Sequence, residues 1–378
     1  MWVPSLEVSS CDHLKYVLST SMMKGLVQLQ ELRISSCELV EEVLLKDISV
    51  EDQLEVVLLP RMKTLELKGL PNLKSFCSIN GILQLSSLQF LKVTNCPMMK
   101  IFASFLNQSN LRFGNQVSNE FFGGEILLLM LEKLSIEDLS SSTGPWHNQL
   151  PYDSFHQLKK LKVKRCKKLL RLVPKLKDLN KLYVEECDSL GEILGIEQSI
   201  GGGYENHLVC MLRDVNLQNL PKLVEIWWNK DLNGILNYPM FSSLKVIKCD
   251  GLMKVFSVSV IKHFLHLEEL YLANCLVMKE VIADDEWKGY AGENAVFPQL
   301  HSLGLVNLPN VTSFCAGVFM VEFPSLEYIN LEACPDMRTF SLGPLVAPKL
   351  NAIVLENGEQ LWKDDLNNTI KHLFMTKE

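Results

Sequence analysis

The sequence lacks long apolar runs, which limits the classes of protein that it can encode. The longest run, ILLLML at 126–131, is far below the roughly 18 residues that a membrane helix needs. The first residues, MWVPSLEVSSCDHLKYVL, show no basic segment followed by an apolar stretch, so no secretory signal is visible. We therefore expect a cytoplasmic protein, with the nucleus as a further compartment.

Catalytic and cofactor motifs are also absent. The chain has no G-x-x-x-x-G-K-[S/T] phosphate loop, no G-x-S-x-G and no H-E-x-x-H. His263 and His266 are three residues apart, but no cysteine or carboxylate arrangement accompanies them, which favours two ordinary residues over a metal site. We expect no enzymatic activity and no catalytic, cofactor-binding or metal-binding residue.

Cysteine is present, but not in pairs that would form a disulfide framework or a zinc site. The chain has 11 cysteines, an odd number, with no CxxC pair, which favours a reducing compartment. A net charge of -7 and a pI of about 5.7 do not point to nucleic acid or an anionic membrane.

A recurring spacing dominates what is present. In FPSLEYINLEACPDMRTF (323–340), Leu326, Ile329 and Leu331 lie at offsets of three and then two, followed by Cys334 and Met337. This is the leucine-rich repeat signature, L-x-x-L-x-L-x-x-N/C-x-L. Eight of the cysteines occupy the same position of a repeat, where a thiol acts as a small buried apolar group.

The signature recurs along the whole chain in about thirteen copies. Eight copies carry cysteine, three carry leucine followed by proline, and two are looser. The cysteine copies begin at Val3, Leu29, Leu88, Leu158, Leu179, Phe241, Leu267 and Leu326; the leucine-proline copies begin at Met62, Leu212 and Leu300, and the looser ones at Leu131 and Leu350.

The spacing predicts the fold. Alternation in the middle of the motif places two apolar side chains on one face of a strand and the intervening residues on the other. One such unit cannot bury its apolar side alone, whereas stacked units share a continuous core. We therefore expect an α/β leucine-rich repeat solenoid, with a curved parallel β-sheet on its concave face and an irregular or short helical convex side.

Two domains are expected: the repeat array over 1–358, and a capping helix with its tail over 359–378. Leu366, Ile370, Leu373 and Phe374 fall on one face of that helix, and Asp364 or Asp365 is placed to cap its start. Because the other end begins within a repeat, we expect the C-terminal part of a longer protein or the product of a truncated gene.

Irregular insertions separate some copies. The three steps into leucine-proline copies are 33 residues long, whereas the steps from 3 to 29, 62 to 88 and 300 to 326 are 26, and the added residues are acidic. We expect these insertions to form loops on the convex side or rim. The largest step, 88–131, contains the polar segment NQSNLRFGNQVSNEFFGG, for which we expect a mobile loop.

A basic segment lies between residues 159 and 181, which contains eleven lysines and arginines and one acid, Asp178. Because several of them flank inward-pointing residues, they should project from the concave surface and could attract an acidic partner. The alternative is a solvated strip that keeps the sheet soluble. The candidate partner-binding basic residues are Lys159, Lys160, Lys162, Lys164, Arg165 and Lys181.

A second set of candidates occupies outward positions of other expected strands. Exposed aromatic residues at such positions are of the type that forms binding hot spots, although a single one is often only tolerated surface. The candidate aromatic and polar residues are Arg33, Phe90, Lys92, Tyr183, Tyr271 and Tyr328.

Three segments are distinctive: the repeats at 297–314 and 323–350, and the tail LWKDDLNNTIKHLF at 361–374. In these segments the chain resembles the C-terminal repeat region of plant coiled-coil-type nucleotide-binding leucine-rich repeat (NB-LRR) disease resistance proteins. The resemblance implies a concave surface that senses a pathogen-derived or host guarded protein. It also implies that this surface holds a nucleotide-binding module inactive, in cis or in trans. ATP or ADP would bind only to that module of full-length relatives.

Other functions remain open from the sequence. One alternative is the substrate-recruiting subunit of a ubiquitin ligase, although F-box helices are absent, and another is a general protein-interaction adaptor. An extracellular receptor would need a signal peptide and capping cysteine pairs. Nucleic-acid binding is weaker still, because the basic segment has no interleaved aromatic residues.

Overall fold

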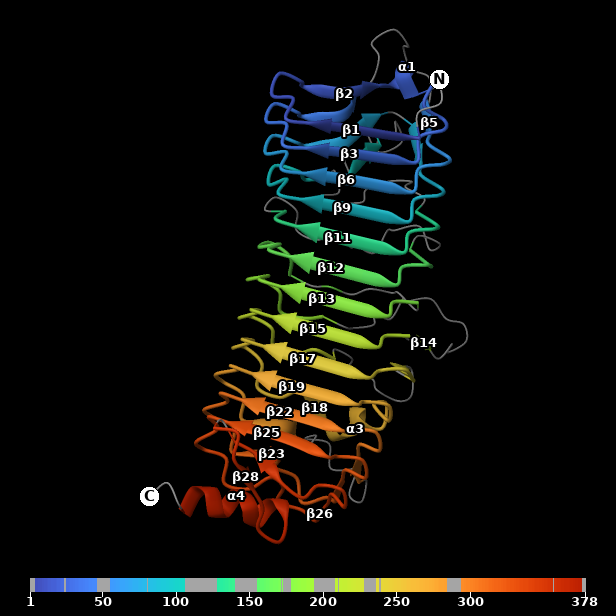
Figure 1. Cartoon of the computed structure of the whole chain (residues 1–378). Helices are drawn as coiled ribbons and strands as arrows, with labels where there is room; N and C mark the ends of the chain where they lie inside the picture. Colours follow the sequence, from blue (N-terminus) through green and yellow to red (C-terminus); the bar gives the residue numbers. More distant parts are fainter. Residues whose placement is uncertain are drawn as a thin grey trace, which may run out of the picture. The chain divides into compact units, whose positions relative to one another are not determined.

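The computed structural model (Figure 1) describes residues 4–23, 25–45, 55–79, 81–105, 128–139, 155–170, 172, 178–193, 208–209, 211–227, 236–237, 239–283, 294–355 and 357–375. The chain divides into two compact units, which are described separately. Unit 1 comprises residues 1–179 and 186–188, and unit 2 comprises residues 180–185 and 189–378. The segment predicted as a mobile loop and most of the acidic insertions lie outside the described residues.

Unit 1 is built on parallel strands that come from successive repeats, and we call the strands of this sheet the principal strands. Each strand pairs with the next in register, residue for residue, as Leu6, Leu32 and Leu65 do across the first three. In order across the sheet, the strands are β1 (Ser5–Ser9), β3 (Glu31–Ser35), β6 (Thr64–Lys68), β9 (Phe90–Thr94), β11 (Lys133–Glu137) and β12 (Lys160–Lys164).

Unit 2 repeats the arrangement and closes it differently at its end. Its strands are parallel up to β27, which pairs antiparallel with β28. In order, they are β13 (Lys181–Glu185), β15 (Asp214–Gln218), β17 (Ser243–Ile247), β19 (Glu269–Ala273), β22 (Ser302–Val306), β25 (Tyr328–Glu332), β27 (Ile353–Val354) and β28 (Gln360–Leu361).

The segments that connect one principal strand to the next, which we call return segments, carry short strands and two short helices. They include the helices α1 (Thr20–Met23) and α3 (Val258–Ile261). In unit 1 the strands are β2 (Tyr16–Ser19), β4 (Glu42–Leu45), β5 (Glu55–Leu58), β7 (Ser75–Ile79), β8 (Gly81–Gln84) and β10 (Ala103–Phe105). In unit 2 they are β14 (Leu208–Val209), β16 (Leu236–Asn237), β18 (Phe256–Ser257), β20 (Glu280–Ala283), β21 (Ala295–Val296), β23 (Ser313–Cys315), β24 (Val321–Glu322) and β26 (Leu345–Val346).

The core lies between the two rows of strands in each unit. Inward residues of the principal strands, such as Leu161 and Val163 of β12, are 0% exposed. Phenylalanines of the return segments fill the other side and stack on one another, as Phe76 and Phe102 do with ring centroids 5.2 Å apart. The leucine-rich repeat fold, with its parallel sheet and C-terminal helix, is confirmed.

A left-handed residue directly follows twelve of the principal strands. In nine of these turns its N–H donates to the last carbonyl of the next strand, as Asn274 does to Val306 at 2.9 Å, so the turn continues the ladder. Asparagine, serine and glycine tolerate a positive φ better than longer side chains do. The twelve residues are Ser10, Ser36, Gly69, Asn95, Asp138, Arg165, Glu186, Asn219, Lys248, Asn274, Asn307 and Ala333.

The signature cysteines fill packing positions in the turn. The ten cysteines within the described part of the chain are all free thiols. Cys275 is 0% exposed and its Sγ donates to the carbonyl of Ala273 at 3.5 Å. Burial raises the pKa of the Cys275 thiol to about 11 and that of Cys96 to about 12, so both are neutral at physiological pH. Cys210 lies outside the described residues.

In two leucine-proline copies, the residue after the proline ties one repeat to the previous one. The side-chain amide of Asn72 donates to the carbonyl of Glu38 at 2.7 Å, and that of Asn310 donates to the carbonyl of Leu276 at 2.5 Å. These bonds satisfy turn carbonyls that the sheet does not pair.

The C-terminal helix α4 (Leu366–Met375) packs on the last repeats of unit 2. Leu366 and Ile370 are 2% and 1% exposed. Of the two predicted capping residues, Asp365 caps the helix, because its Oδ1 accepts from the N–H of Asn368 at 2.8 Å. Leu373 is half-buried, and the side chain of Phe374 lies outside what the structure describes. The domain boundary at 358 stays a prediction.

Asn367 joins this helix to residues 339–341, which belong to the last cysteine copy. Its Oδ1 accepts from the backbone N–H groups of Phe340 at 2.8 Å and Ser341 at 3.0 Å, and from the hydroxyl of Thr339 at 3.0 Å. Its Nδ2 donates to the carbonyl of Ser341 at 3.1 Å. One side chain therefore replaces the hydrogen bonds that another repeat would supply.

The register of β12 can be tested by two substitutions in neighbouring positions. Leu161→Asp buries an unpaired carboxylate and should unfold unit 1, whereas Lys162→Glu changes a half-exposed residue and should leave it folded. Thermal unfolding followed by circular dichroism measures both. Equal losses of melting temperature would show that the register is wrong.

The role of Asn367 can be tested in the same way. Asn367→Ala leaves two backbone N–H groups without their acceptor, and it should lower the free energy of unfolding by about 2–3 kcal/mol. Asn368→Ala is the matched control, because that amide only contacts Asp365 at the surface. Urea denaturation compares the two variants, and a similar small effect of both would contradict the assignment.

Candidate recognition surface

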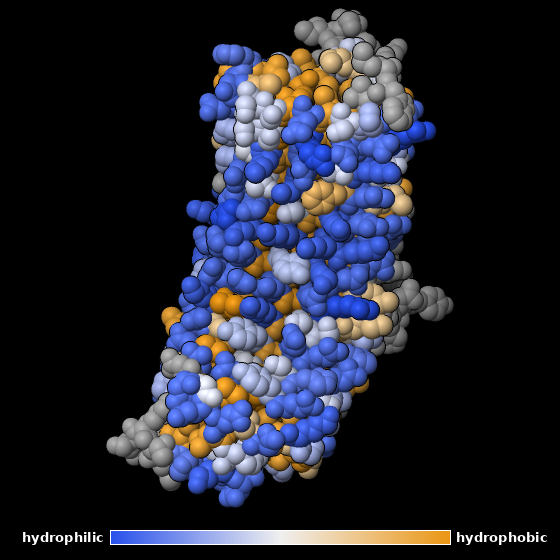
Figure 2. Space-filling model, in the orientation of Figure 1, coloured by the Kyte–Doolittle hydropathy of each residue, from blue (hydrophilic) through white to orange (hydrophobic). Residues whose placement is uncertain are grey.

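Each unit presents one face of its principal sheet to solvent, which we call the open face. The residues between the inward leucines project from it, and strand register aligns them in rows across neighbouring repeats. Figure 2 shows this side of the molecule as mostly hydrophilic, with apolar side chains visible between the polar ones. In unit 1, the central row is Glu7, Arg33, Glu66, Lys92, Ser135 and Lys162.

Opposite charges alternate along much of this row. The guanidinium of Arg33 lies 2.6 Å from the carboxylate of Glu31 and 3.4 Å from that of Glu66. Two of the predicted candidates, Arg33 and Lys92, therefore stand beside acidic neighbours, and Phe90 is half-buried on β9. Pairing therefore neutralises part of the charge on the unit 1 open face locally.

The predicted basic residues are also largely compensated. Lys159 pairs with Glu132 at 3.1 Å in unit 1, and Lys181 pairs with Asp214 at 2.6 Å in unit 2. Lys160 is exposed and Lys162 half-buried at outward positions of β12. The acidic partners, Glu132 and Asp214, come from other repeats. A count of charges within residues 159–181 therefore does not include them. The binding role of the basic residues stays a prediction.

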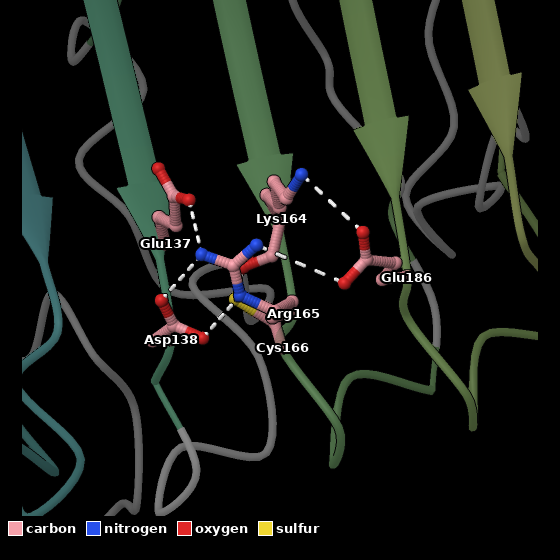
Figure 3. Close-up of polar contacts among 6 residues, drawn as sticks. All are labelled: Glu137, Asp138, Lys164, Arg165, Cys166 and Glu186. Carbon is pink, nitrogen blue, oxygen red and sulfur yellow. Dashed lines mark hydrogen bonds and ion pairs between the residues drawn. The ribbon is translucent and has the colours of Figure 1, made fainter.

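Arg165 forms the densest polar cluster, drawn in Figure 3. Its Nε lies 2.5 Å from Oδ1 of Asp138 and its Nη2 lies 2.7 Å from Oδ2, which makes a two-pronged contact. Nη2 also donates to Glu137, and Nη1 lies 3.7 Å from Glu186. Lys164 reaches the same Glu186 at 3.3 Å. Three carboxylates thus surround two cations.

This cluster binds successive turns of unit 1 together. Asp138, Arg165 and Glu186 occupy the left-handed position after their strands, which brings their side chains side by side. The hydrogen bonds to Asp138, followed by the charges of the carboxylates, hold the pKa of Arg165 above its ordinary value. The arrangement is a structural clamp, and it leaves Arg165 little capacity to bind another anion.

The open face of unit 2 differs in composition. Its central row is Tyr183, Asn216, Lys245, Tyr271, Gly304 and Asn330. The ammonium of Lys245 lies 5.2 Å from the ring centroid of Tyr271, within the range of a cation–π contact. Tyr328, in the neighbouring row, is 45% exposed, and Tyr183 and Tyr271 are half-buried. The three predicted tyrosines therefore lie on the open face.

Gly304 gives Tyr271 room to lie along the sheet. A Cβ atom at Gly304 would lie 2.5 Å from Cδ2 of Tyr271, which is too close for both to remain in place. Sequence reasoning identified Tyr271 but missed Gly304 and Lys245, because only strand register places them beside the ring.

No group of three or more metal-ligating side chains occurs among the residues that the structure describes. His266 Nδ1 lies 3.2 Å from Oε1 of Gln299, and burial lowers the pKa of His263. In the same described part, no helix is long and apolar enough to cross a membrane.

The Arg165 clamp can be tested by a conservative change. Arg165→Lys keeps one positive charge but cannot contact both oxygens of Asp138, so it should lower the free energy of unfolding by about 1 kcal/mol. Lys159→Met removes a more exposed ion pair and should change it by less than about 0.5 kcal/mol. Urea unfolding measures both, and a larger loss in the Lys159 variant would contradict the clamp.

Comparison with known proteins places this architecture in a family. The family described as plant disease resistance protein RPS2-like, leucine-rich repeats, matches residues 3–112 and 130–276, more than half of the chain. The probable disease resistance protein At4g27220 of Arabidopsis thaliana is 36% identical over 96 residues, which cover 25% of this chain. The match spans only 10% of that relative.

The family match and the fold agree. The matched residues contain the principal strands β1 to β19, whose register aligns the outward rows. The chain belongs to the RPS2-like leucine-rich repeat family of plant disease resistance proteins.

Proposed function

We propose that the chain is a non-enzymatic protein-recognition scaffold, the effector-sensing and autoregulatory repeat region of an intracellular plant immune receptor. The observation that carries this proposal is the open face, where rows of polar and aromatic side chains project from a rigid parallel sheet. None of these side chains is needed to fill the core, and the strand backbone fixes their spacing.

The sheet favours recognition of proteins over small molecules. Aligned outward positions extend across several repeats, so a partner can make many contacts at once, as protein interfaces require. Tyrosines on a rigid element lose little conformational entropy on binding. Membership in the disease resistance family agrees with a role in defence.

The proposed partners are two. One is a pathogen-derived protein or a guarded host protein, and the other is a nucleotide-binding module, in cis or in trans, which would itself bind ATP or ADP. The proposed location is the cytoplasm, with the nucleus as a further compartment. A general adaptor remains the second candidate, because the same open face would serve it. The family match does not favour a ubiquitin ligase subunit.

The proposal is tested by co-immunoprecipitation from plant leaves. The tagged chain is expressed with a separately expressed nucleotide-binding module of a coiled-coil-type resistance protein. Wild type should capture the module. Lys160→Glu/Lys162→Glu reverses two charges on the open face and should reduce capture.

The matched control is Lys222→Glu/Lys279→Glu, which makes the same charge change at exposed positions outside the principal strands. It should leave capture unchanged. Failure of wild type to capture the module would contradict the autoregulatory role. Equal losses in both double variants would show that overall charge, and not the open face, governs the interaction.

A further inference from the structure

Carboxylates and tyrosines gather on the open face of unit 2, over β19, β22 and β25. We call this group the acidic–tyrosine face. Around β19, β22 and β25, in the lower half of the view, Figure 2 shows apolar side chains and side chains of intermediate hydropathy among hydrophilic ones. The outward strand residues of this face are Glu269, Tyr271, Gly304, Tyr328 and Glu332, and the exposed Glu268 and Glu327 lie directly before β19 and β25.

Backbone pairing holds these residues in line. Glu269 pairs with Ser302, and Ser302 pairs with Tyr328, so Glu269 and Tyr328 stand two strands apart, about 10 Å. The N–H of His301 donates to the carbonyl of Glu268 at 2.9 Å, and the N–H of Glu327 donates to the carbonyl of His301 at 3.1 Å. The sheet therefore fixes the distance between Glu268 and Glu269 on one side and Tyr328 on the other, and an extended peptide could span it.

The negative charge of this face is poorly compensated. Within the described residues, Glu268 and Glu269 make no ion pair, although both are exposed. Glu327 pairs with Lys349 at 3.6 Å, but both side chains are more than half exposed. No lysine or arginine occupies an outward position of β19, β22 or β25. This contrasts with unit 1, where Arg33 and Arg165 each contact acidic neighbours.

One interaction within the chain shows which chemical group the face attracts. Lys245 reaches from β17 and places its ammonium over the ring of Tyr271 at 5.2 Å. A cation above an aromatic ring is stabilised by the negative charge of the ring face, and neighbouring carboxylates add to the attraction. A partner cation placed over Tyr271 would therefore take the position that the Lys245 ammonium occupies in the free chain.

Gly304 lets the Tyr271 ring lie across the neighbouring strand. Because a Cβ there would lie 2.5 Å from Tyr271, glycine lets the ring tilt toward β22. Gly304 is itself buried, so the ring covers this outward position of β22. A partner segment would therefore pass over the ring of Tyr271, between Glu269 of β19 and Tyr328 of β25.

We propose that the acidic–tyrosine face binds an extended basic segment of a partner protein, with arginine or lysine side chains over Tyr271 and Tyr328 and beside Glu268 and Glu269. The inference rests on the proposed recognition function and specifies the chemistry of the partner. Guanidinium groups suit the face best, because they stack on aromatic rings and also make paired contacts with carboxylates.

The test uses two labelled peptides and the full chain. One is a decapeptide that alternates arginine and valine, so that an extended backbone directs every arginine to one side. The other replaces each arginine with glutamate. Fluorescence anisotropy at low ionic strength should show binding of the basic peptide and no binding of the acidic one.

Variants assign the binding to the face. Glu268→Gln/Glu269→Gln and Tyr271→Leu should each weaken binding of the basic peptide by about tenfold. Asp336→Asn/Glu359→Gln is the matched control, because it removes two exposed acids of unit 2 outside the face, and it should leave the affinity unchanged. Circular dichroism checks that every variant is folded.

The outcomes separate this inference from the proposed function. Equal weakening by the control pair, or preference for the acidic peptide, would overturn the acidic–tyrosine face as a site for basic segments. If the nucleotide-binding module is still captured in leaves, the recognition function survives that result. If basic peptide binds as expected but no module is captured, the autoregulatory role fails and the inference stands.

Discussion

Burial of the repeated leucines is the constraint on which the rest of the structure depends. A single repeat exposes apolar residues on the two sides that face its neighbours, and only stacking removes these residues from water. Burying each large side chain stabilises the fold by roughly 1.5–3 kcal/mol. Stacking in turn fixes strand register. Leu32 and Leu65 pair across β3 and β6, and the residues beside them are thereby aligned on the open face. The recognition surface is a consequence of core packing.

The need to stack also restricts which residues occupy the turns after the principal strands. A left-handed residue follows each of twelve strands and in nine turns continues the hydrogen-bond ladder, and the cysteine or leucine that follows, buried in most turns, fills the space beneath it. In one turn, a long side chain at the left-handed position also links neighbouring repeats. Arg165 occupies such a position and contacts the carboxylates of neighbouring turns. At the end of unit 2, Asn367 supplies hydrogen bonds where another repeat would otherwise do so.

Much of the fold could be predicted, because the repeat spacing reports directly on burial. The inward positions of β12 and the capping helix with Leu366 and Ile370 follow from spacing alone. The candidate surface was less predictable. Ion pairs between repeats, such as Lys159 with Glu132, join residues 27 positions apart, and step lengths vary along the chain. A charge count within one segment therefore overstated the positive potential around Lys159 and Arg165.

The two open faces differ in what they can offer a partner. In unit 1, charged residues are paired with one another across strands, which stabilises the sheet and consumes their hydrogen-bonding capacity. In unit 2, Glu268 and Glu269 are exposed and make no ion pair within the described residues, and Tyr328 is 45% exposed, so more of the charge and aromatic surface is available for binding. The proposed recognition function would therefore rest on outward residues that intramolecular pairing leaves accessible.

Hydroxyl-radical footprinting tests most directly whether the open face is the recognition surface. The chain is oxidised alone and with a captured partner, and modification of each residue is measured by mass spectrometry. Protection of Tyr271 and Tyr328, with Met253 and Leu342 unchanged on other surfaces, is the predicted result. Protection of Met253 and Leu342, with both tyrosines still fully oxidised, would contradict it.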